Sequence, residues 1–292
     1  MQKTDTYHLG CPAWSIPEWR GVFLPKGTAQ SALLSEYSKV FNTVEGNSFF
    51  YALPRLEMVE RWAAESAPGF EFCMKVPRDI SHGARLVSNA EVFEQLVERL
   101  EILYNAGRLG PTFLQLHASF GPHRLGELAG FLEAWPTHLP LAVEVRHAKF
   151  FEEGADEAVL DSLLTEHSVD RVIFDSRALF QAPPTDPVET KSQERKPRLP
   201  VRWKSTGGRP FVRFVGRNNI DQVEPWQSEV AEVVANWIKA GKHPYVFMHR
   251  PDDTLAPQLC ARFHSRLKEY LPELPDLRMP VIEEQLGLPF DL

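Results

Sequence analysis

Residues 41–51, FNTVEGNSFFY, decide the predicted fold. The stretch begins as an apolar strand and ends in a polar, aromatic tip. Side chains alternate between the two faces of a strand, so that one face carries Phe41, Thr43, Glu45 and Asn47. If Phe41 and Thr43 face the interior of a barrel, Glu45 and Asn47 continue that face up to its mouth. A carboxylate there is either a member of a buried ion pair or a working group.

Short apolar strands like this one recur along the chain, with helical segments between them. The other strands are predicted at 7–10, 70–76, 112–116, 141–145, 171–174, 211–215 and 245–248. Alternation of strands and helices favours a parallel sheet, and eight such units close a (β/α)8 barrel. A doubly wound open sheet competes, but no GxGxxG follows any strand. We therefore predict a single TIM-type (β/α)8 barrel domain over residues 1–292.

Two stretches do not fit the strand and helix pattern. Residues 182–209, after the sixth strand, are rich in proline and charge and have little periodicity, so we expect a long irregular insertion that is either a lid or a mobile loop. A proline-rich tail from residue 271 is apolar enough to lie on the barrel or under its floor. Neither stretch suggests a second domain, because α/β barrels routinely exceed about 250 residues.

Composition narrows the class of protein. The formal net charge is -7, which disfavours general nucleic-acid binding. The N-terminus lacks the apolar core of a signal peptide, and no run of about 18 apolar residues predicts a membrane helix. The three cysteines, Cys11, Cys73 and Cys260, are far apart and form no CxxC, which fits a reducing compartment. We expect a cytoplasmic protein.

Polar side chains end nearly every predicted strand, where barrel enzymes place their working groups. These residues are Trp14, Glu45, Asn47, Lys75, Gln115, His117, Glu144, Arg146, Asp175, Arg177, Arg213, Arg217, His249 and Arg250. Glu144 and Arg146 share one strand face, so they form either an internal ion pair or a site for an anionic ligand. Glu45 and Glu144 together could serve as general acid and base, or as the carboxylate pair of a glycoside hydrolase.

Lysine and arginine at the mouth suggest an anionic ligand. Lys75 could form a Schiff base, hold a phosphate or carboxylate, or pair with Glu45 on the preceding strand. Gly216, Arg217 and Asn218 follow strand seven, and His249 and Arg250 follow strand eight, where barrels often bind phosphate. His82 lies in the loop after Lys75.

Aromatic and metal-ligating residues leave further alternatives open. Trp14 and Tyr51 belong to an aromatic group that could stack on a sugar or base, or simply pack at the rim. Asp175 could ligate a metal with Glu45, Glu144 and His249, but no HxH or HExxH spacing supports such a site, and we predict none. The sequence leaves the cofactor unknown.

Several motifs in their order resemble the domain-of-unknown-function 72, or YecE-like, family. They are GCPAWSIPEWRGVFLP, VEGNSFFYALP, FEFCMKVPRDISH, GPTFLQLHASF, LAVEVRH, FDS and FVRFVGRN, from about residue 9 to 267. The resemblance implies a TIM-type barrel and no established activity. Gly46 stands where the family usually has isoleucine, and the last strand ends FMHRPDD rather than in a YFNN-type run.

These observations favour an enzyme that acts on a small anionic, phosphorylated or sugar-like metabolite at the barrel mouth, with Glu45 or Glu144 as acid and base. The alternative is a non-catalytic barrel that binds or senses the same kind of ligand. A metal-dependent hydrolase or isomerase is the third possibility.

Overall fold

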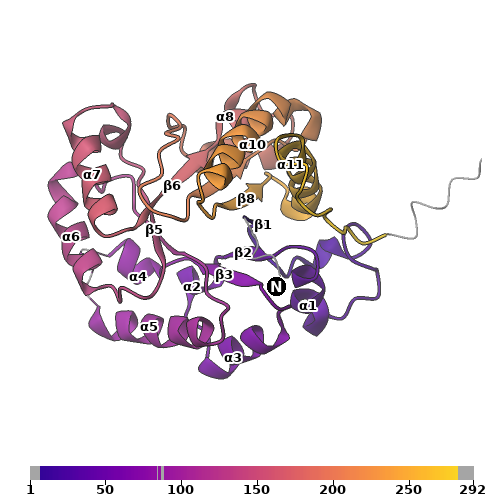
Figure 1. The fold of residues 1–292 in the computed structure, drawn as a ribbon, viewed down its shortest axis with the longest axis horizontal. Coiled ribbons are helices and arrows are strands. Elements are labelled where there is room, and N and C mark those ends of the chain that lie inside the picture. Colours follow the sequence, from indigo (N-terminus) through magenta and orange to yellow (C-terminus); the bar gives the residue numbers. More distant parts are fainter. Residues whose placement is uncertain (1–6, 84, 87–88, 282–292) are drawn as a thin grey trace, which may run out of the picture.

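The computed structural model describes residues 7–83, 85–86 and 89–281, and helices surround the strands in it (Figure 1). The strands are β1 His8–Gly10, β2 Thr43–Gly46, β3 Glu71–Met74, β4 Thr112–Gln115, β5 Leu141–Glu144, β6 Asp170–Asp175, β7 Phe211–Val215 and β8 Tyr245–His249. The helices are α1 Leu33–Ser38, α2 Ser48–Tyr51, α3 Leu56–Glu65, α4 Arg78–Ser81, α5 Ala90–Asn105, α6 Leu125–Ala134, α7 Ala155–Glu166, α8 Arg177–Phe180, α9 Pro187–Arg195, α10 Glu224–Lys239 and α11 Ala256–Tyr270.

The strands do not form the predicted closed, eight-stranded barrel. All strand pairs are parallel, but they make two sheets: a curled, six-stranded half-barrel in the order β1-β8-β7-β6-β5-β4, and a separate sheet of β2 and β3. The TIM-type barrel prediction is therefore wrong, although each of the eight predicted strands overlaps a strand of the structure.

The ladder is interrupted on both sides of the two-stranded sheet. Between β1 and β2, the amide of Leu9 donates to the side-chain Oδ1 of Asn42 at 2.8 Å instead of to a strand carbonyl. Gly10 lies so close to β2 that a Cβ on it would be 2.1 Å from the carbonyl oxygen of Thr43. Between β3 and β4 the described residues make only isolated bridges, one of which joins Lys75 to Phe113. A side-chain hydrogen bond at the first seam and isolated backbone bridges at the second thus stand in place of regular pairing.

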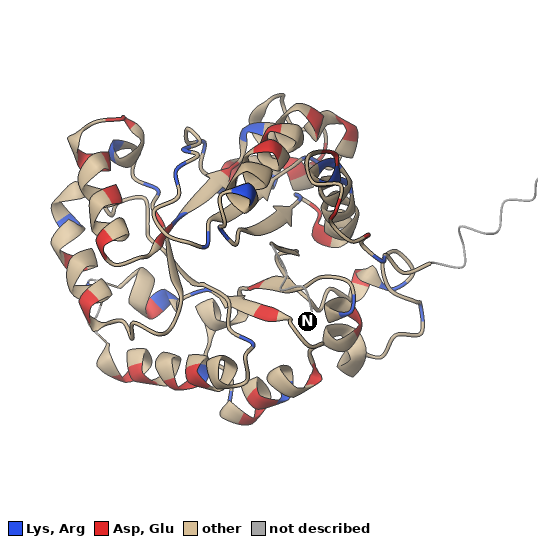
Figure 2. Ribbon diagram, in the orientation of Figure 1, with Lys and Arg blue, Asp and Glu red and all other residues tan. Residues whose placement is uncertain are grey.

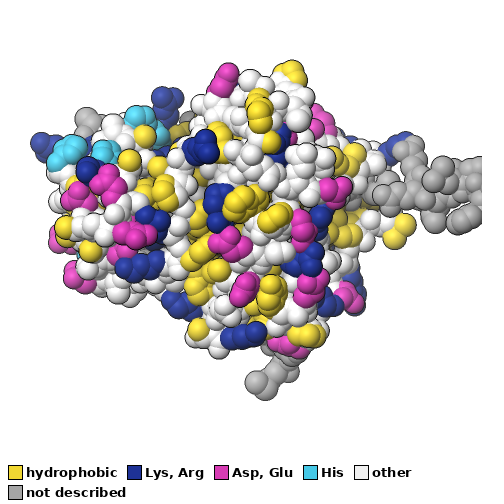
Figure 3. Space-filling model, turned by 90° about the horizontal axis from the view of Figure 1, so that it is seen from above, with side chains coloured by type: hydrophobic (Ala, Val, Ile, Leu, Met, Phe, Trp, Pro, Cys, Tyr) yellow, Lys and Arg dark blue, Asp and Glu magenta, His cyan; other side chains and the backbone are white. Residues whose placement is uncertain are grey.

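Alternating side chains divide the core into two layers. The inner faces of the strands meet in a small aromatic cluster that includes Phe113, Phe211, Tyr245 and Phe247. The outer faces pack against the surrounding helices in the main core. Many charged residues lie on the outer helices, while a few lie on the strands themselves (Figure 2). On the face seen from above, charged side chains of both signs alternate with hydrophobic ones (Figure 3).

The segment 182–209 is more ordered than its sequence predicts. Helix α9 lies within it and is capped at its amino end by Asp186, whose carboxylate accepts hydrogen bonds from the amides of Val188 and Glu189. Glu189 is fully buried, and farther along the chain the amides of Gly207 and Arg209 donate to Asp170. Buried contacts at both ends count against a wholly mobile insertion.

The described part of the C-terminal tail lies beside the amino ends of β1 and β2, as expected for a tail under the floor. Leu271 and Leu274 are buried, and Nε2 of His264 lies 2.9 Å from the carbonyl oxygen of Pro275. The rest of the predicted tail, residues 282–292, lies outside the described residues.

Candidate functional site

Three charged side chains meet inside the curled sheet, near the carboxyl ends of the strands. Glu45 comes from β2, Glu144 from β5 and Arg213 from β7, and each is at most 3% exposed. Strand alternation brings them together, because each side chain has the parity that faces inward. The sequence places them 69 to 168 residues apart.

Arg213 bridges the two carboxylates. Its Nε and Nη2 donate to the two oxygens of Glu45, each at 2.7 Å, and its Nη1 donates to Glu144 at 2.5 Å. A guanidinium matches a carboxylate in this two-bond arrangement, which fixes both groups. The interior therefore contains a charged cluster in which one arginine serves two glutamates.

Neighbouring side chains occupy the remaining positions on these carboxylates. Arg146 donates through Nε to Glu144 at 2.6 Å, which is the predicted ion pair of strand five. Asn47 donates to Glu45 at 2.9 Å, and Nε2 of His249 lies 2.9 Å from the other Glu45 oxygen. Every oxygen of the two carboxylates therefore has a nitrogen partner.

The partners keep both carboxylates ionised. Burial alone would raise the pKa of Glu45, but Arg213 and His249 outweigh it and hold the pKa well below its usual range. Burial acts on Glu144 in the same way, and Arg146 and Arg213 lower its pKa to about 2. Such weak bases suit fixed negative charges better than proton transfer near neutral pH.

Lys75 stands apart because no carboxylate binds it among the residues that the structure describes. It follows β3 and is 8% exposed. Its Nζ donates to the neutral Oε1 of Gln115 at 3.1 Å and lies 4.0 Å from the ring centre of Phe50. Burial first, and then the charge of Arg213, lower its pKa to about 8. The alternative of a salt bridge to Glu45 is wrong, since Arg213, Asn47 and His249 take that carboxylate.

Cations outnumber carboxylates at this end of the sheet. Besides Arg213 and Lys75, Arg146 reaches Gln115 at 2.9 Å while 19% of its side chain stays exposed. Lys196, after α9, points its Nζ toward the ring of Phe174 at 6.0 Å. Burial and the charge of Arg213 lower the pKa of Lys196. The cluster is named here the mouth cluster: Glu45, Lys75, Gln115, Glu144, Arg146, Lys196 and Arg213.

Lys196 and Phe174 were not among the predicted site residues. Lys196 lies in the segment with no periodicity, so its position could not be inferred. Phe174 pairs in register with Arg213 and therefore shares its inward face, a signal that strand parity would have given. The guanidinium groups of Arg146 and Arg213 each lie 5.5 Å from its ring centre.

The structure does not bring Asp175 into the mouth cluster. It lies on the opposite face of β6 from Phe174, and its carboxylate binds the guanidinium of Arg177 at 2.9 and 3.0 Å. Arg177 also contacts Glu229 of α10. Asp175 therefore belongs to an ion-pair group between the sheet and the helices.

The predicted phosphate-binding loops after β7 and β8 hold the chain together instead. Arg217 pairs with the buried Glu189 of α9, and the side chain of Asn218 donates to Asp186 at 2.7 Å. Arg250 donates to the backbone carbonyls of Arg217, Asn218 and Leu255. These contacts anchor α9 to the ends of two strands, which leaves the side chains of Arg217 and Arg250 engaged.

The remaining predicted residues lie toward the rim. Trp14 packs edge-on against Trp62 and Phe72, so it is largely a packing residue. Tyr51 is 83% exposed beside Phe50, and the His82 ring lies 5.4 Å from that of Phe50. Tyr51 and His82 therefore border the mouth cluster rather than join it.

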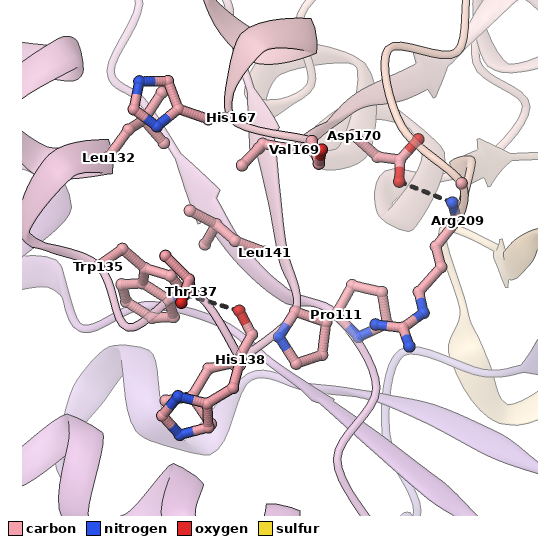
Figure 4. Close-up of a pocket in the computed structure, with 14 residues that line it drawn as sticks. Pro111, Leu132, Trp135, Thr137, His138, Leu141, His167, Val169, Asp170 and Arg209 are labelled. Carbon is pink, nitrogen blue, oxygen red and sulfur yellow. Dashed lines mark hydrogen bonds between the residues drawn. The ribbon is translucent and has the colours of Figure 1, made fainter.

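Two cavities lie at the opposite, amino ends of the strands. One of about 290 Å³ lies between the starts of β4, β5 and β6, where Pro111, Leu141 and Asp170 line it with Trp135 and Arg209 (Figure 4). The other, of about 560 Å³, lies under β1 and β2 beside the tail. The charged cluster lies near the carboxyl ends of the strands, and the chemistry of its side chains identifies it as the candidate site.

The described residues contain no group of three or more histidine, cysteine, aspartate or glutamate side chains arranged to hold a metal ion. None of their helices combines the length and apolar character needed to cross a bilayer.

Known proteins resemble this chain in both sequence and fold. The family model described as "Protein of unknown function DUF72" matches residues 8–281. The UPF0759 protein YecE of Escherichia coli is 36% identical over 281 residues, which cover 96% of this chain and 99% of that protein. The UPF0759 protein YunF of Bacillus subtilis is 24% identical, over 77% of this chain and 83% of that protein.

Crystal structures of two DUF72 family proteins have a similar fold. That from Enterococcus faecalis has a TM-score of 0.67 at 18% identity, covering 94% of this chain and 99% of that one. That from Thermotoga maritima has a TM-score of 0.66 at 22% identity, covering 90% and 99%. The extent of the family match and the identity to YecE together show that this chain belongs to the DUF72 family of proteins of unknown function.

Proposed function

We propose that this protein is an enzyme that acts on a small anionic carbonyl compound at the mouth cluster, with the amine of Lys75 as the reacting group. The observation that carries the proposal is the placement of Lys75. Its Nζ is buried near two carboxylates, yet of the residues that the structure describes it contacts only the neutral Gln115 and the face of Phe50. A structural lysine in such a position gains stability from a carboxylate partner, and this one has none among the described residues.

The surroundings of Lys75 favour the neutral amine. A lysine becomes a nucleophile when burial and neighbouring cations disfavour its ammonium form. Lys75 meets both conditions, because it is 8% exposed and Arg213 lies in the same cluster. With a pKa of about 8, a fraction of on the order of one tenth is unprotonated near pH 7.

The reaction is the addition of this amine to a carbonyl carbon. The nitrogen lone pair forms the new C–N bond, and the carbonyl oxygen takes up protons and leaves as water, so that an imine remains. Hydrolysis, in which water adds to the imine carbon and the C–N bond breaks, later regenerates the amine of Lys75 and releases a carbonyl compound. Glu45 and Glu144 keep Arg213 and Arg146 in place as fixed counter-charges, which replaces the acid and base role expected from the sequence.

The excess of cations supports an anionic substrate. Arg146 keeps part of its side chain exposed and Lys196 approaches from the α9 segment, so both can contact a carboxylate or phosphate at the mouth. Arg213 is fully engaged and sets the local positive charge.

Reductive trapping tests the proposal. The protein is incubated with pyruvate or with glyceraldehyde 3-phosphate, reduced with borohydride, and mapped by mass spectrometry. We expect a covalent adduct on Lys75, and none at that position in a Lys75→Met variant. Lys149, an exposed lysine that pairs with Glu152, is the control for non-specific modification. Equal labelling of Lys149 and Lys75 would refute a special reactivity of Lys75.

A non-catalytic binding protein is the second candidate, favoured by the full engagement of both carboxylates. In that case the same anions would raise the melting temperature without forming an adduct or being converted. Turnover of any trapped compound, followed by NMR, separates the two candidates.

A further inference from the structure

Four rings and most of the cations occupy different halves of the mouth, with Lys75 after β3 and Phe174 on β6 as the two exceptions. Rings follow three successive strands: Phe50 and Tyr51 after β2, His82 after β3, and His117 after β4. Cations come from the other half: Arg146 after β5, Lys196 from the segment after β6, and Arg213 from β7. Gln115 lies between the two halves, because its Oε1 accepts hydrogen bonds from both Lys75 and Arg146.

The rings form a continuous path that leads outward from Lys75. The ring centre of Phe50 is 4.0 Å from the Nζ of Lys75, and Tyr51 stands edge-on to Phe50 at 5.2 Å. On another edge, His82 is 5.4 Å from Phe50, and His117 is 5.6 Å from His82. Side chains 5 to 6 Å apart in edge-on contact hold one another in place.

The exposed end of the path has no packing role in the fold. Tyr51 is 83% exposed, so most of its ring is in contact with solvent. Its open ring face is free to stack on another planar group. Tyr51 ends α2, directly after the strand that carries Glu45.

His82 acts as a neutral ring on the path. Burial, and then its electrostatic interactions with His117 and Lys75, lower the pKa of His82 to about 4. His82 therefore adds no positive charge near neutral pH, and its ring is available for stacking. Apart from Lys75, the cations of the mouth cluster thus come from the half formed by β5, β6 and β7.

We infer that the substrate carries a planar ring beside its anionic group, and that the ring stacks on Tyr51 and Phe50 while the anion lies against Arg146 and Lys196. This inference rests on the proposed function for the anionic half, and it adds an orientation. Lys75 lies where the two halves meet, so the reacting carbon would lie between the ring and the anion. Substrates of this class are aryl or heteroaryl acids and phosphates.

Inorganic phosphate and phenyl phosphate are the probes, because they differ only by the ring. Binding is measured by calorimetry for the unaltered protein, for Tyr51→Ala and for Tyr104→Ala, a matched control. Tyr104 is also an exposed tyrosine, at 42%, but it lies on α5 beside His138. We expect phenyl phosphate to bind about tenfold tighter than phosphate, since base or ring stacking on one aromatic side chain is worth about 1–3 kcal/mol.

The variants separate the two parts of the proposal. Tyr51→Ala should remove most of the tenfold preference, and Tyr104→Ala should leave it unchanged. If phosphate and phenyl phosphate bind equally to the unaltered protein, the ring inference is wrong while the anion site stands. If neither probe binds, the anion site fails and the ring inference fails with it. A preference that survives Tyr51→Ala would also overturn the role given to Tyr51.

Discussion

Two buried arginines on neighbouring strands face opposite sides of the curled sheet. Arg171 of β6 points outward to α7, where its Nη1 contacts Glu157 and Asp161 at 2.9 Å each. Arg213 of β7 points inward and contacts Glu45 and Glu144. Each arginine is at most 3% exposed and binds two carboxylates. By burial and pairing alone, the two regions cannot be told apart.

The difference lies in the cations that surround each arginine. Near Arg171, Arg202 binds Glu157 at 3.2 Å and Lys204 binds Asp161 at 2.8 Å, so each added cation has a carboxylate. Near Arg213, the described part of the chain gives the Nζ of Lys75 only Gln115 and Phe50 as partners. A buried arginine that binds carboxylates thus indicates a structural role. A buried cation left without a carboxylate indicates a site for a negatively charged ligand.

The largest expected effect is a similar loss of unfolding free energy when either of the two arginines is replaced. Arg213→Met and Arg171→Met each leave two carboxylates without their main partner, so each variant should lose about 3–5 kcal/mol of unfolding free energy. Urea unfolding followed by circular dichroism measures the loss. If Arg213→Met costs less than about 1 kcal/mol, the inner cluster does not stabilise the fold as the outer one does.

Acid titration should then reveal Glu144. Its pKa falls from 4.5 in the unfolded chain to about 2 in the folded one, so its stabilising contribution is present above about pH 4.5 and is lost as the pH falls toward 2. Its size is about 3 kcal/mol from that shift. Melting temperatures of the unaltered protein and of Glu144→Gln, measured between pH 6 and 3, should differ in slope. Parallel curves would show that Glu144 is not ionised through contact with Arg146 and Arg213.

The smallest stability effects separate the two regions most sharply. Lys75→Met removes a buried charge without breaking an ion pair, so stability at pH 7 should rise by about 1–2 kcal/mol. The folded pKa of Lys75 is about 8 and the unfolded one 10.5, so the gain should shrink as the pH rises through that window and the unaltered lysine loses its charge in both states.

Lys204→Met is the matched change in the outer region. Lys204 is 59% exposed and paired with Asp161, so its loss should cost at most about 1 kcal/mol and leave any trapping reaction intact. Thermal melts of both variants over pH 7 to 10.5 make the comparison. A destabilising Lys75→Met would mean that Lys75 has a structural partner after all.

Much of the site could be predicted from strand parity, but the closure of the sheet could not. The alternation of side chains along a strand predicts that Glu45, Glu144 and Arg213 face inward, because each has the parity of the inward-facing residues of its own strand. The same rule places Phe174 and Asp175 on opposite faces of β6, because the regular strand continues through Asp175. Parity says nothing about which neighbouring strands pair, since that depends on contacts such as the one between Asn42 and Leu9.

The loops were harder to predict than the strands. Arg217 and Arg250 follow strands that end at the mouth, which made them candidates for phosphate binding. Their partners, Glu189 and the carbonyls of Asn218 and Leu255, lie in segments whose course is set by tertiary packing. The sequence of α9 has little helical amphipathicity, so neither the helix nor the inward position of Lys196 could be inferred.

The close approach of Gly10 to Thr43 restricts which residues can replace Gly10 in evolution. Because even a methyl group there would lie 2.1 Å from a backbone carbonyl, any larger residue would act as a wedge between the half-barrel and the strand that carries Glu45. The displacement would pass along β2 to the Glu45 carboxylate, which Arg213 holds from the opposite side of the interior. The absence of a side chain at Gly10 therefore sets the distance between β1 and β2, and with it the width of the interior in which the two glutamates and the arginine meet.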